Sequence, residues 1–272
     1  SPALIVPAPG IRSRARYIGR NLRFWAREAP AARERRGRPR TIHGGQTSTL
    51  TKMSNVSRAQ TTALASLLPA SPIITELGRA FTAAGHELYL VGGSVRDALL
   101  GTSGHALDFT TSARPDETQR LLNEISDAVW DVGRDFGTIS ALARRGDHEW
   151  LIEVTTFRAD SYRSSSRKPE VVYGLSVEDD LMRRDFTVNA MALDIGSGDP
   201  GDWRFVDPFG GLDDLASCIL RTPSTPEISF GDDPLRMMRA ARFSSQLNFE
   251  VDPVCRKAMS QMADRICIIS AE

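Results

Sequence analysis

The 272-residue sequence contains few cysteines and histidines, and neither type occurs at metal-binding spacing. All three cysteines lie in the last third of the chain, and no two of them form a CxxC pair. An odd number of unpaired cysteines is typical of reduced thiols, so the sequence argues against a disulfide framework or a zinc site. The four histidines also lack ligand spacing. We therefore expect a cytoplasmic protein.

Long apolar runs and net charge are also missing. No run approaches the length of about 18 residues that a membrane-spanning helix needs, so no membrane span is predicted. Overall, 34 basic residues balance 34 acidic ones. Residues 1–52, however, hold 12 of the basic and two of the acidic residues, which leaves 22 basic and 32 acidic residues for the remainder. Because residues 53–272 are acidic overall, they would have to contact nucleic acid through local clusters of arginine.

The first 52 residues are rich in Arg, Ala, Pro and Gly and show little apolar periodicity. We interpret residues 1–52 as a disordered basic leader. The composition changes at Met53, which suggests translated upstream sequence with Met53 as the natural start. Two alternatives remain open: an Arg-rich, acid-poor transit peptide, or a basic arm that contacts RNA.

The most informative segment is an apolar run, Leu88–Val91, that ends in Gly92-Gly93 and continues as a helical pattern. A strand, a glycine turn and a helix in this order leave free backbone N–H groups at a helix start, where a phosphate can bind. A second apolar segment follows and bears one acid, Asp108. Its carboxylate would hold Mg²⁺ against that phosphate.

Four blocks in order resemble the class II nucleotidyltransferases, the family of bacterial CCA-adding tRNA nucleotidyltransferases and poly(A) polymerases. The blocks are GGSVRD with ALDFTT, RRDFTVNAMA, DPFGGLDDL and DDPLRMMRAARF. The resemblance covers residues 72 to 250 and implies an α+β fold, a polymerase-β-type head with a small mixed sheet followed by an all-helical neck. It implies a catalytic head at 53–212 and, at 213–272, the start of a helical neck or RNA-binding domain that is truncated.

The resemblance also implies a reaction. Family members transfer CMP and AMP from CTP and ATP to the 3′ end of tRNA and release pyrophosphate, with Mg²⁺ as the cofactor. The implied partners are therefore ATP, CTP and the tRNA 3′ end. Because poly(A) polymerases share all four blocks, poly(A) addition is an alternative. A non-catalytic nucleotide- or RNA-binding fragment is another.

One departure from the family pattern bears on catalysis. The family has Asp-x-Asp on the strand after the glycine turn, with both acids binding Mg²⁺, whereas this chain has Ala106 and Asp108. Residues 106 and 108 of a strand share a face, and two-metal transfer uses such carboxylates to clamp the reacting oxygens. Asp108 is the predicted catalytic metal ligand. Glu153, on a neighbouring strand, is either a third catalytic carboxylate or a solvent-facing acid. We expect impaired chemistry.

The first two blocks supply predicted nucleotide contacts. Gly93 belongs to the phosphate-binding turn, and Arg96 in the following helix is predicted to reach the triphosphate. Arg184, Asp185 and Asn189 are predicted to form a compact donor–acceptor set on adjacent turns of a helix. The resemblance implies that this block recognises the ribose.

The fourth block supplies a predicted base-reading face. Asp233, Arg236, Arg239 and Arg242 recur every three residues and so line one helical face. Three arginines without local acids are costly to cluster unless an anion or a base edge meets them. The resemblance implies that Asp233 and Arg236 read the Watson–Crick edge of the incoming nucleotide. The carboxylate would accept from the exocyclic amino group of C or A, and the guanidinium would donate to the neighbouring ring nitrogen or carbonyl. G and U would leave these buried polar groups unpaired and so be rejected.

The apolar periodicity sets the remaining expectations. Helical spacing after residue 58 ends at Gly85. Further helices are predicted at 94–100, 115–125, 232–247 and 253–264, strands at 87–91, 106–111, 127–132, 137–144 and 149–156, and a mobile loop at 158–176.

Overall fold

The computed structural model describes residues 61, 63, 65–102, 104, 106–159, 172–196 and 198–268. The predicted basic leader, residues 1–52, lies outside the described residues. No helix in the described ranges is both long and apolar enough to cross a membrane.

The larger lobe is built on a mixed sheet, which within the described residues has seven strands in the order β3-β4-β5-β2-β1-β8-β9. Strands β2 and β5 pair in parallel, and the other neighbours in the sheet pair antiparallel. The strands are β1 (Leu88–Val91), β2 (Ala106–Thr111), β3 (Ala128–Trp130), β4 (Thr138–Arg145), β5 (His148–Thr156), β8 (Ala192–Asp194) and β9 (Arg204–Val206). This sheet confirms the predicted α+β class and all five predicted strands.

One face of the sheet forms the main core against α3 (Ser71–Ala83) and α5 (Pro115–Ile125). Helix α3 presents Ile73, Leu77 and Phe81 to this core at helical spacing, and all three are fully buried. Strand β5 alternates buried and exposed positions over most of its length. Its apolar side chains thus enter the core, and Glu153 is left on the opposite face.

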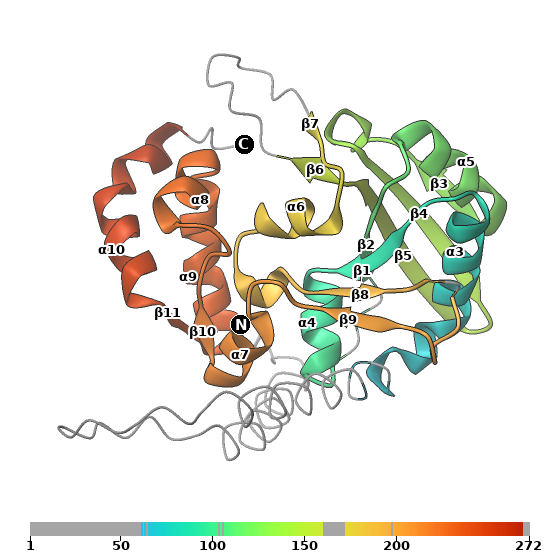
Figure 1. Cartoon of the computed structure of the whole chain (residues 1–272), viewed down its shortest axis with the longest axis horizontal. Coiled ribbons are helices and arrows are strands. Elements are labelled where there is room, and N and C mark those ends of the chain that lie inside the picture. Colours follow the sequence, from blue (N-terminus) through green and yellow to red (C-terminus); the bar gives the residue numbers. More distant parts are fainter. Residues whose placement is uncertain are drawn as a thin grey trace, which may run out of the picture.

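The second lobe is mostly helical (Figure 1). Its elements are α7 (Gly211–Ser217), α8 (Pro226–Asp232), α9 (Leu235–Leu247), α10 (Pro253–Gln261), the 3₁₀ helix η4 (Ala263–Ile268), and the parallel pair β10 (Ile219–Leu220) and β11 (Glu250–Val251). Short elements connect the lobes: α4 (Gly93–Leu99) contacts η3 (Thr187–Asn189), which contacts α7. In Figure 1, α6 (Val177–Met182) lies between the sheet and α9.

The turn before α7 joins the lobes closely. The Asp207 carboxylate accepts hydrogen bonds from the N–H groups of Gly211 (2.7 Å) and Leu212 (2.9 Å), at the start of α7. A Cβ on Gly211 would lie 2.2 Å from the carbonyl oxygen of Thr187 in η3. Only glycine permits this approach of backbone to backbone, so the turn packs α7 closely against η3.

Two expectations about secondary structure are wrong in part. The segment predicted as a loop, 158–176, begins and ends in paired strands, β6 (Arg158–Ala159) and β7 (Val172–Tyr173); residues 160–171 lie outside the described residues. The helix predicted at 232–247 corresponds to α9, which begins three residues later at Leu235, while Asp232 is the last residue of a separate helix, α8. Pro234 explains the break, since the residue before a proline avoids helical backbone, and Asp233 is indeed extended (φ −143°, ψ 97°).

Candidate nucleotide-binding cleft

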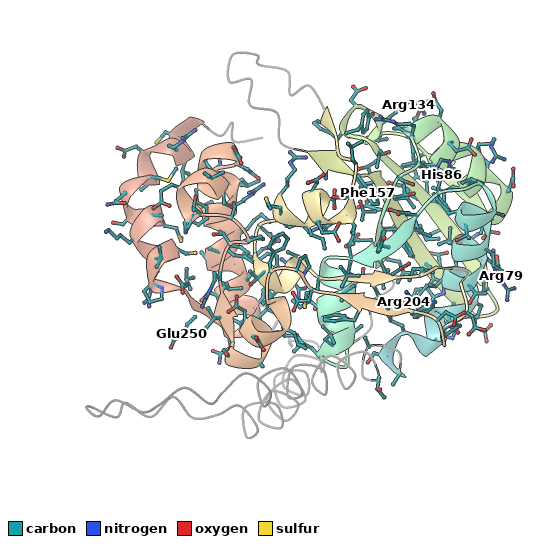
Figure 2. The ribbon with its side chains drawn as sticks, viewed as in Figure 1. Arg79, His86, Arg134, Phe157, Arg204 and Glu250 are labelled. Carbon is teal, nitrogen blue, oxygen red and sulfur yellow. The ribbon has the colours of Figure 1, made fainter. Side chains whose placement is uncertain are left out.

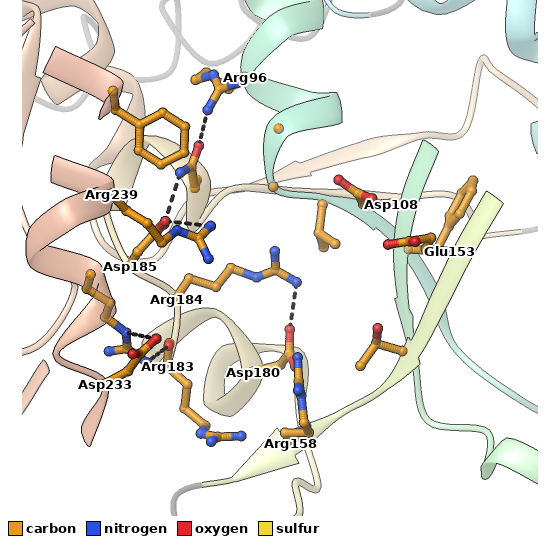
Figure 3. A pocket seen from close by; sticks show the side chains of 18 of the residues that line it. Arg96, Asp108, Glu153, Arg158, Asp180, Arg183, Arg184, Asp185, Asp233 and Arg239 are labelled. Atoms are coloured by element: carbon orange, nitrogen blue, oxygen red, sulfur yellow. Dashed lines mark hydrogen bonds and ion pairs between the residues drawn. The ribbon is translucent and has the colours of Figure 1, made fainter. Parts of the chain in front are cut away.

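A cleft of about 680 Å³ runs between the polar face of the sheet and α9 (Figure 3). Its lining contains all eleven residues predicted as catalytic or nucleotide-binding: Gly93, Arg96, Asp108, Glu153, Arg184, Asp185, Asn189, Asp233, Arg236, Arg239 and Arg242. Ala106 is not part of the lining. The lining also holds residues that sequence reasoning did not select, among them Arg158, Asp180, Arg183 and Phe243.

The predicted glycine turn forms one end of this cleft. Gly92 has φ +68°, a conformation that favours glycine. A Cβ at this position would lie 2.9 Å from Nη1 of Arg184 and 4.0 Å from Oδ2 of Asp108. A Cβ on Gly93 would lie 3.6 Å from Nη2 of Arg96 and 4.0 Å from Oδ2 of Asp108. The turn therefore brings open backbone next to a carboxylate and a guanidinium.

The two predicted acids are direct neighbours on parallel strands, since Asp108 of β2 is in register with Glu153 of β5. Burial raises the pKa of Asp108, and the negative charge of Glu153 raises it further, against the opposing effect of Arg184 and Arg96. The hydroxyl of Ser94 accepts from the Asp108 backbone N–H (2.9 Å) and holds the strand.

This acid pair decides how well the site fits a metal ion. Asp108 and Glu153 place two carboxylates together, and Mg²⁺ is commonly held by one or two carboxylates with substrate phosphates completing its shell. Among the described residues, no group of three His, Cys, Asp or Glu side chains is arranged to hold a metal. Ala106, two residues before Asp108 on β2, is exposed and offers only a methyl group. The donors fit one Mg²⁺ and lack a carboxylate for the family's two-metal arrangement.

A buried chain of polar contacts links the sheet lobe to α9. Nη1 of Arg96 donates to Oδ1 of Asn189 (2.6 Å), and Nδ2 of Asn189 donates to Oδ1 of Asp185 (2.9 Å). Oδ2 of Asp185 pairs with Nη2 of Arg239 on α9 (2.8 Å). Arg96 also donates through Nε to Asp97 (2.9 Å), and this contact orients the guanidinium. Figure 3 shows these contacts along one wall of the cleft.

This arrangement corrects one part of the prediction for the second block. Arg184, Asp185 and Asn189 were expected on adjacent turns of one helix. Helix α6 ends at Met182, and Asn189 belongs to the separate 3₁₀ turn η3. The set is nevertheless compact, because Asn189 folds back to Asp185, whose Oδ1 also accepts from the Phe186 N–H (2.8 Å).

The arginines of α9 also differ from the predicted acid-free face. Arg239 has an acid from a distant part of the chain, Asp185. Arg236 is buried and donates to the carbonyl and hydroxyl oxygens of Ser229 (3.2 and 2.8 Å) and to the carbonyl of Arg183 (2.6 Å). Burial lowers the pKa of Arg236. Asp233 precedes the helix and accepts from the Leu235 N–H through Oδ1 (2.9 Å).

An aromatic ring that was not selected from the sequence completes this side. The guanidinium carbons of Arg96 and Arg242 lie 5.3 and 4.7 Å from the ring centre of Phe243, and Phe243 also packs edge-on against Phe186. Cation–π contacts of this kind hold arginines in place. The sequence signal was available, since Phe243 ends the fourth block.

Comparison with known proteins gives consistent matches. Residues 88–221 match a family model described as the Poly A polymerase head domain. The CCA-adding enzyme of Leuconostoc mesenteroides is 39% identical over 206 residues, which cover 75% of this chain and 47% of that protein. The CCA-adding enzyme of Streptococcus gordonii is 42% identical over 191 residues, covering 70% of this chain and 44% of that protein. The chain therefore spans less than half the length of these relatives.

Solved structures give the same match. The Bacillus stearothermophilus CCA-adding enzyme in complex with CTP has a TM-score of 0.61 and 36% identity, over 75% of this chain and 45% of that chain. A tRNA nucleotidyltransferase complexed with a primer tRNA and an incoming ATP analog has a TM-score of 0.54 and 31% identity, over 71% of this chain and 51% of that chain.

Proposed function

Because this chain belongs to the nucleotidyltransferase family of CCA-adding enzymes and poly(A) polymerases, we propose that its cleft binds CTP and ATP for addition to the 3′ end of tRNA, and that Ala106 strongly impairs the transfer step. The observation that carries the proposal is one cleft lined by all eleven predicted site residues, which come from both lobes. Similar structures were determined with CTP, and with a primer tRNA and an ATP analog.

Asp233 and Arg236 are the proposed base-reading pair. A guanidinium has five N–H donors, and three of those of Arg236 are used by Ser229 and Arg183. The Nε–H and one Nη2–H remain, and Nε lies 4.0 Å from Oδ2 of Asp233. Donor and acceptor thus stand side by side at the cleft. Such an edge complements the exocyclic amino group and neighbouring ring acceptor that C and A present.

Asp185 and Asn189 are proposed to face the ribose. Their mutual hydrogen bond and the pairing of Asp185 with Arg239 fix both side chains before a nucleotide enters. Preorganised groups of this kind lose little conformational freedom on binding.

Asp108 and Glu153 would hold Mg²⁺ in this proposal. When bound, the ion would neutralise charge on the phosphates and activate the attacking oxygen. The chain's own contribution would be to hold Asp108 through Ser94, whose hydroxyl accepts from the Asp108 backbone N–H, and near the positive charge of Arg184. A missing ligand forfeits several kcal/mol of transition-state stabilisation, and each ~1.4 kcal/mol is about tenfold in rate. We therefore propose binding without efficient transfer.

The test combines nucleotide binding with incorporation on one preparation of the full chain. We expect CTP and ATP to bind, and labelled CMP to be added to tRNA lacking CCA at a rate near background. Efficient CMP addition would refute the proposed impairment. Failure of CTP, ATP, GTP and UTP alike to bind would refute the proposed nucleotide site.

Two other functions have specific support. The matched head-domain model is named for poly(A) polymerase. In that case ATP alone would extend an RNA primer into a tail, whereas CCA addition stops after the terminal A. Ala106 favours a non-catalytic nucleotide or RNA binder, and that function predicts Mg²⁺-dependent binding with no incorporation.

A further inference from the structure

Exposed apolar side chains gather at one edge of the sheet lobe, outside the cleft. Ten large apolar side chains are exposed among the described residues, and three of them lie within seven consecutive positions: Trp130 (37% exposed), Val132 (89%) and Phe136 (54%). They belong to β3 and to the turn that follows it, which contains the 3₁₀ helix η2 (Arg134–Phe136). None of the three lines the cleft. A concentration of exposed apolar groups is typical of a surface that binds another molecule.

The same segment carries negative charge. Residues 127–136 contain one basic residue, Arg134, and three acids: Asp127, Asp131 and Asp135. The guanidinium of Arg134 is directed toward α5, where it donates to Oε1 of Gln119 (2.6 Å) and to the carboxylate of Asp116. Figure 2 shows Arg134 at the outer rim of the sheet lobe. We call residues 127–136 the acidic edge, because its surface combines exposed apolar side chains with a net negative charge.

The acidic edge is also an open edge of the sheet. Strand β3 pairs with β4, and no other strand pairs with it in the part of the chain that the structure describes. The turn after β3 is preformed, since the N–H groups of Arg134 and Phe136 donate to the carbonyls of Asp131 (2.8 Å) and Gly133 (2.9 Å). An unpaired edge with apolar side chains beside it can accept an extended polypeptide as one more strand.

Charge decides which kind of polymer fits the acidic edge. An RNA strand would bring its phosphates against three carboxylates, and such like-charge contacts are unfavourable. A basic polypeptide with apolar side chains complements both properties of the surface. Residues 11–27 of this chain have that composition, with six arginines, three aromatic residues and neither an acid nor a proline. The lack of proline matters because proline cannot donate to a strand ladder.

We propose that residues 11–27 bind the acidic edge of their own chain as an added strand beside β3. Residues 28–60 connect this segment to the described part of the chain, and they can span up to about 110 Å when extended. A folded unit of about 200 residues has a radius of gyration of ~17 Å, so the connection is long enough to reach the acidic edge. The tether also gives an effective concentration on the order of 1 mM, so a weak contact suffices.

Hydrogen exchange of the full chain, followed by mass spectrometry, tests the proposal, with a synthetic peptide of residues 11–27 as the unprotected reference. A contact with a Kd of ~0.1 mM would be about 90% formed at the tethered concentration, so these amides should exchange about tenfold more slowly than in the peptide. Asp131→Lys combined with Asp135→Lys should return exchange to within about twofold of the peptide, because like charges then meet. Val132→Ser, at a highly exposed position, should weaken the protection without affecting the fold.

The matched control is Glu250→Lys combined with Asp264→Lys. This pair makes the same change of charge at exposed positions of the helical lobe, where Figure 2 labels Glu250. Exchange of residues 11–27 should equal that in the unchanged protein. Adding Arg20→Glu and Arg23→Glu to the variant with lysines at 131 and 135 should restore slow exchange, because opposite charges face each other again. Thermal unfolding identifies any variant that misfolds, and Val132→Ser then carries the comparison.

Four results would overturn the proposal. In the first, residues 11–27 of the unchanged protein exchange as fast as the free peptide. In the second, they exchange slowly but the lysine substitutions have no effect, so the segment binds elsewhere. In the third, protection increases with protein concentration, which assigns the segment to a second copy of the chain. In the fourth, Trp130→Ala weakens the binding of single-stranded RNA and leaves exchange of residues 11–27 unchanged, which assigns the acidic edge to RNA.

Discussion

Asn189 is the central member of the buried network that joins the two lobes, and Asn189→Asp changes only one of its bonds. The side chain is 6% exposed. Its Oδ1 accepts from Arg96 at 2.6 Å, and its Nδ2 donates to Asp185 at 2.9 Å. Aspartate has the same shape, so it keeps the acceptor toward Arg96. It replaces the donor toward Asp185 with a carboxylate oxygen, and two acceptors then face each other.

The magnitude follows from the two distances. At an effective dielectric constant of about 20, unit charges at 2.6 and 2.9 Å interact by roughly 6 kcal/mol each. The new attraction to Arg96 and the new repulsion from Asp185 have opposite signs and largely cancel. What remains is the lost hydrogen bond to a charged acceptor, which is worth about 1.5–3 kcal/mol. We therefore expect Asn189→Asp to lower the free energy of unfolding by about 2 kcal/mol at pH 8.

The loss should disappear in acid. A proton shared between the introduced carboxylate and that of Asp185 restores an O–H···O bond, so the pair has a raised pKa in the native state of the variant. The native variant then binds a proton that the unfolded chain does not, and its stability falls as pH rises through that pKa. Urea unfolding at pH 5 and pH 8 measures the difference. Asn123→Asp, at an exposed position of α5, is the control and should change stability little at either pH. An equal loss at both pH values, or none at pH 8, would refute the reasoning.

Three further changes test other parts of the molecule. Asp108→Asn should raise the melting temperature at pH 8, because burial and Glu153 raise the pKa of the native carboxylate. The gain in melting temperature should shrink as pH falls, because the native carboxylate then becomes protonated. A gain that is independent of pH would contradict this. Ala106→Asp should strengthen Mg²⁺ binding measured by calorimetry, since it restores paired carboxylates on one strand face. Unchanged Mg²⁺ binding would mean that position 106 does not supply the missing metal ligand. Gly211→Ala should destabilise by about 1–3 kcal/mol or more through its clash with η3. Gly210→Ala, which meets nothing within 4 Å, should cost only about 1 kcal/mol for its positive φ in urea unfolding, and equal losses for both would refute the clash.

Local patterns predicted much of the fold. The strand, glycine turn and helix around Gly92 are encoded within one short segment, and α5 has the predicted bounds. Strand β5 lies where it was predicted, and its alternating burial leaves Glu153 opposite the core. The missed strands β8 and β9 have three residues each, too few for a period-2 pattern. Pro234 was a usable signal for the break before α9 and was not used.

Long-range contacts explain the rest of the differences. Which residues gather in the cleft was predicted, but the partners of each were not. Arg96 and Asn189 are 93 positions apart in sequence. Arg239 was expected to lack an acid because only near neighbours are visible in a sequence, and its partner, Asp185, comes from a distant part of the chain. Propensity and spacing carry no information about such pairs.

The structure separates the residues that organise the cleft from Ala106, the position at which we propose that a metal ligand is missing. Ala106 does not line the cleft that the network from Arg96 to Arg239 borders, and the hydroxyl of Ser94 donates to the Ala106 backbone oxygen (3.4 Å). An exposed side chain at the start of β2 can therefore change from carboxylate to methyl without disturbing the strand register or the arginines. Loss of a metal ligand here would lower the rate of transfer and leave the fold and the nucleotide contacts in place. This is the physical reason to expect a chain that binds its substrates and transfers them poorly.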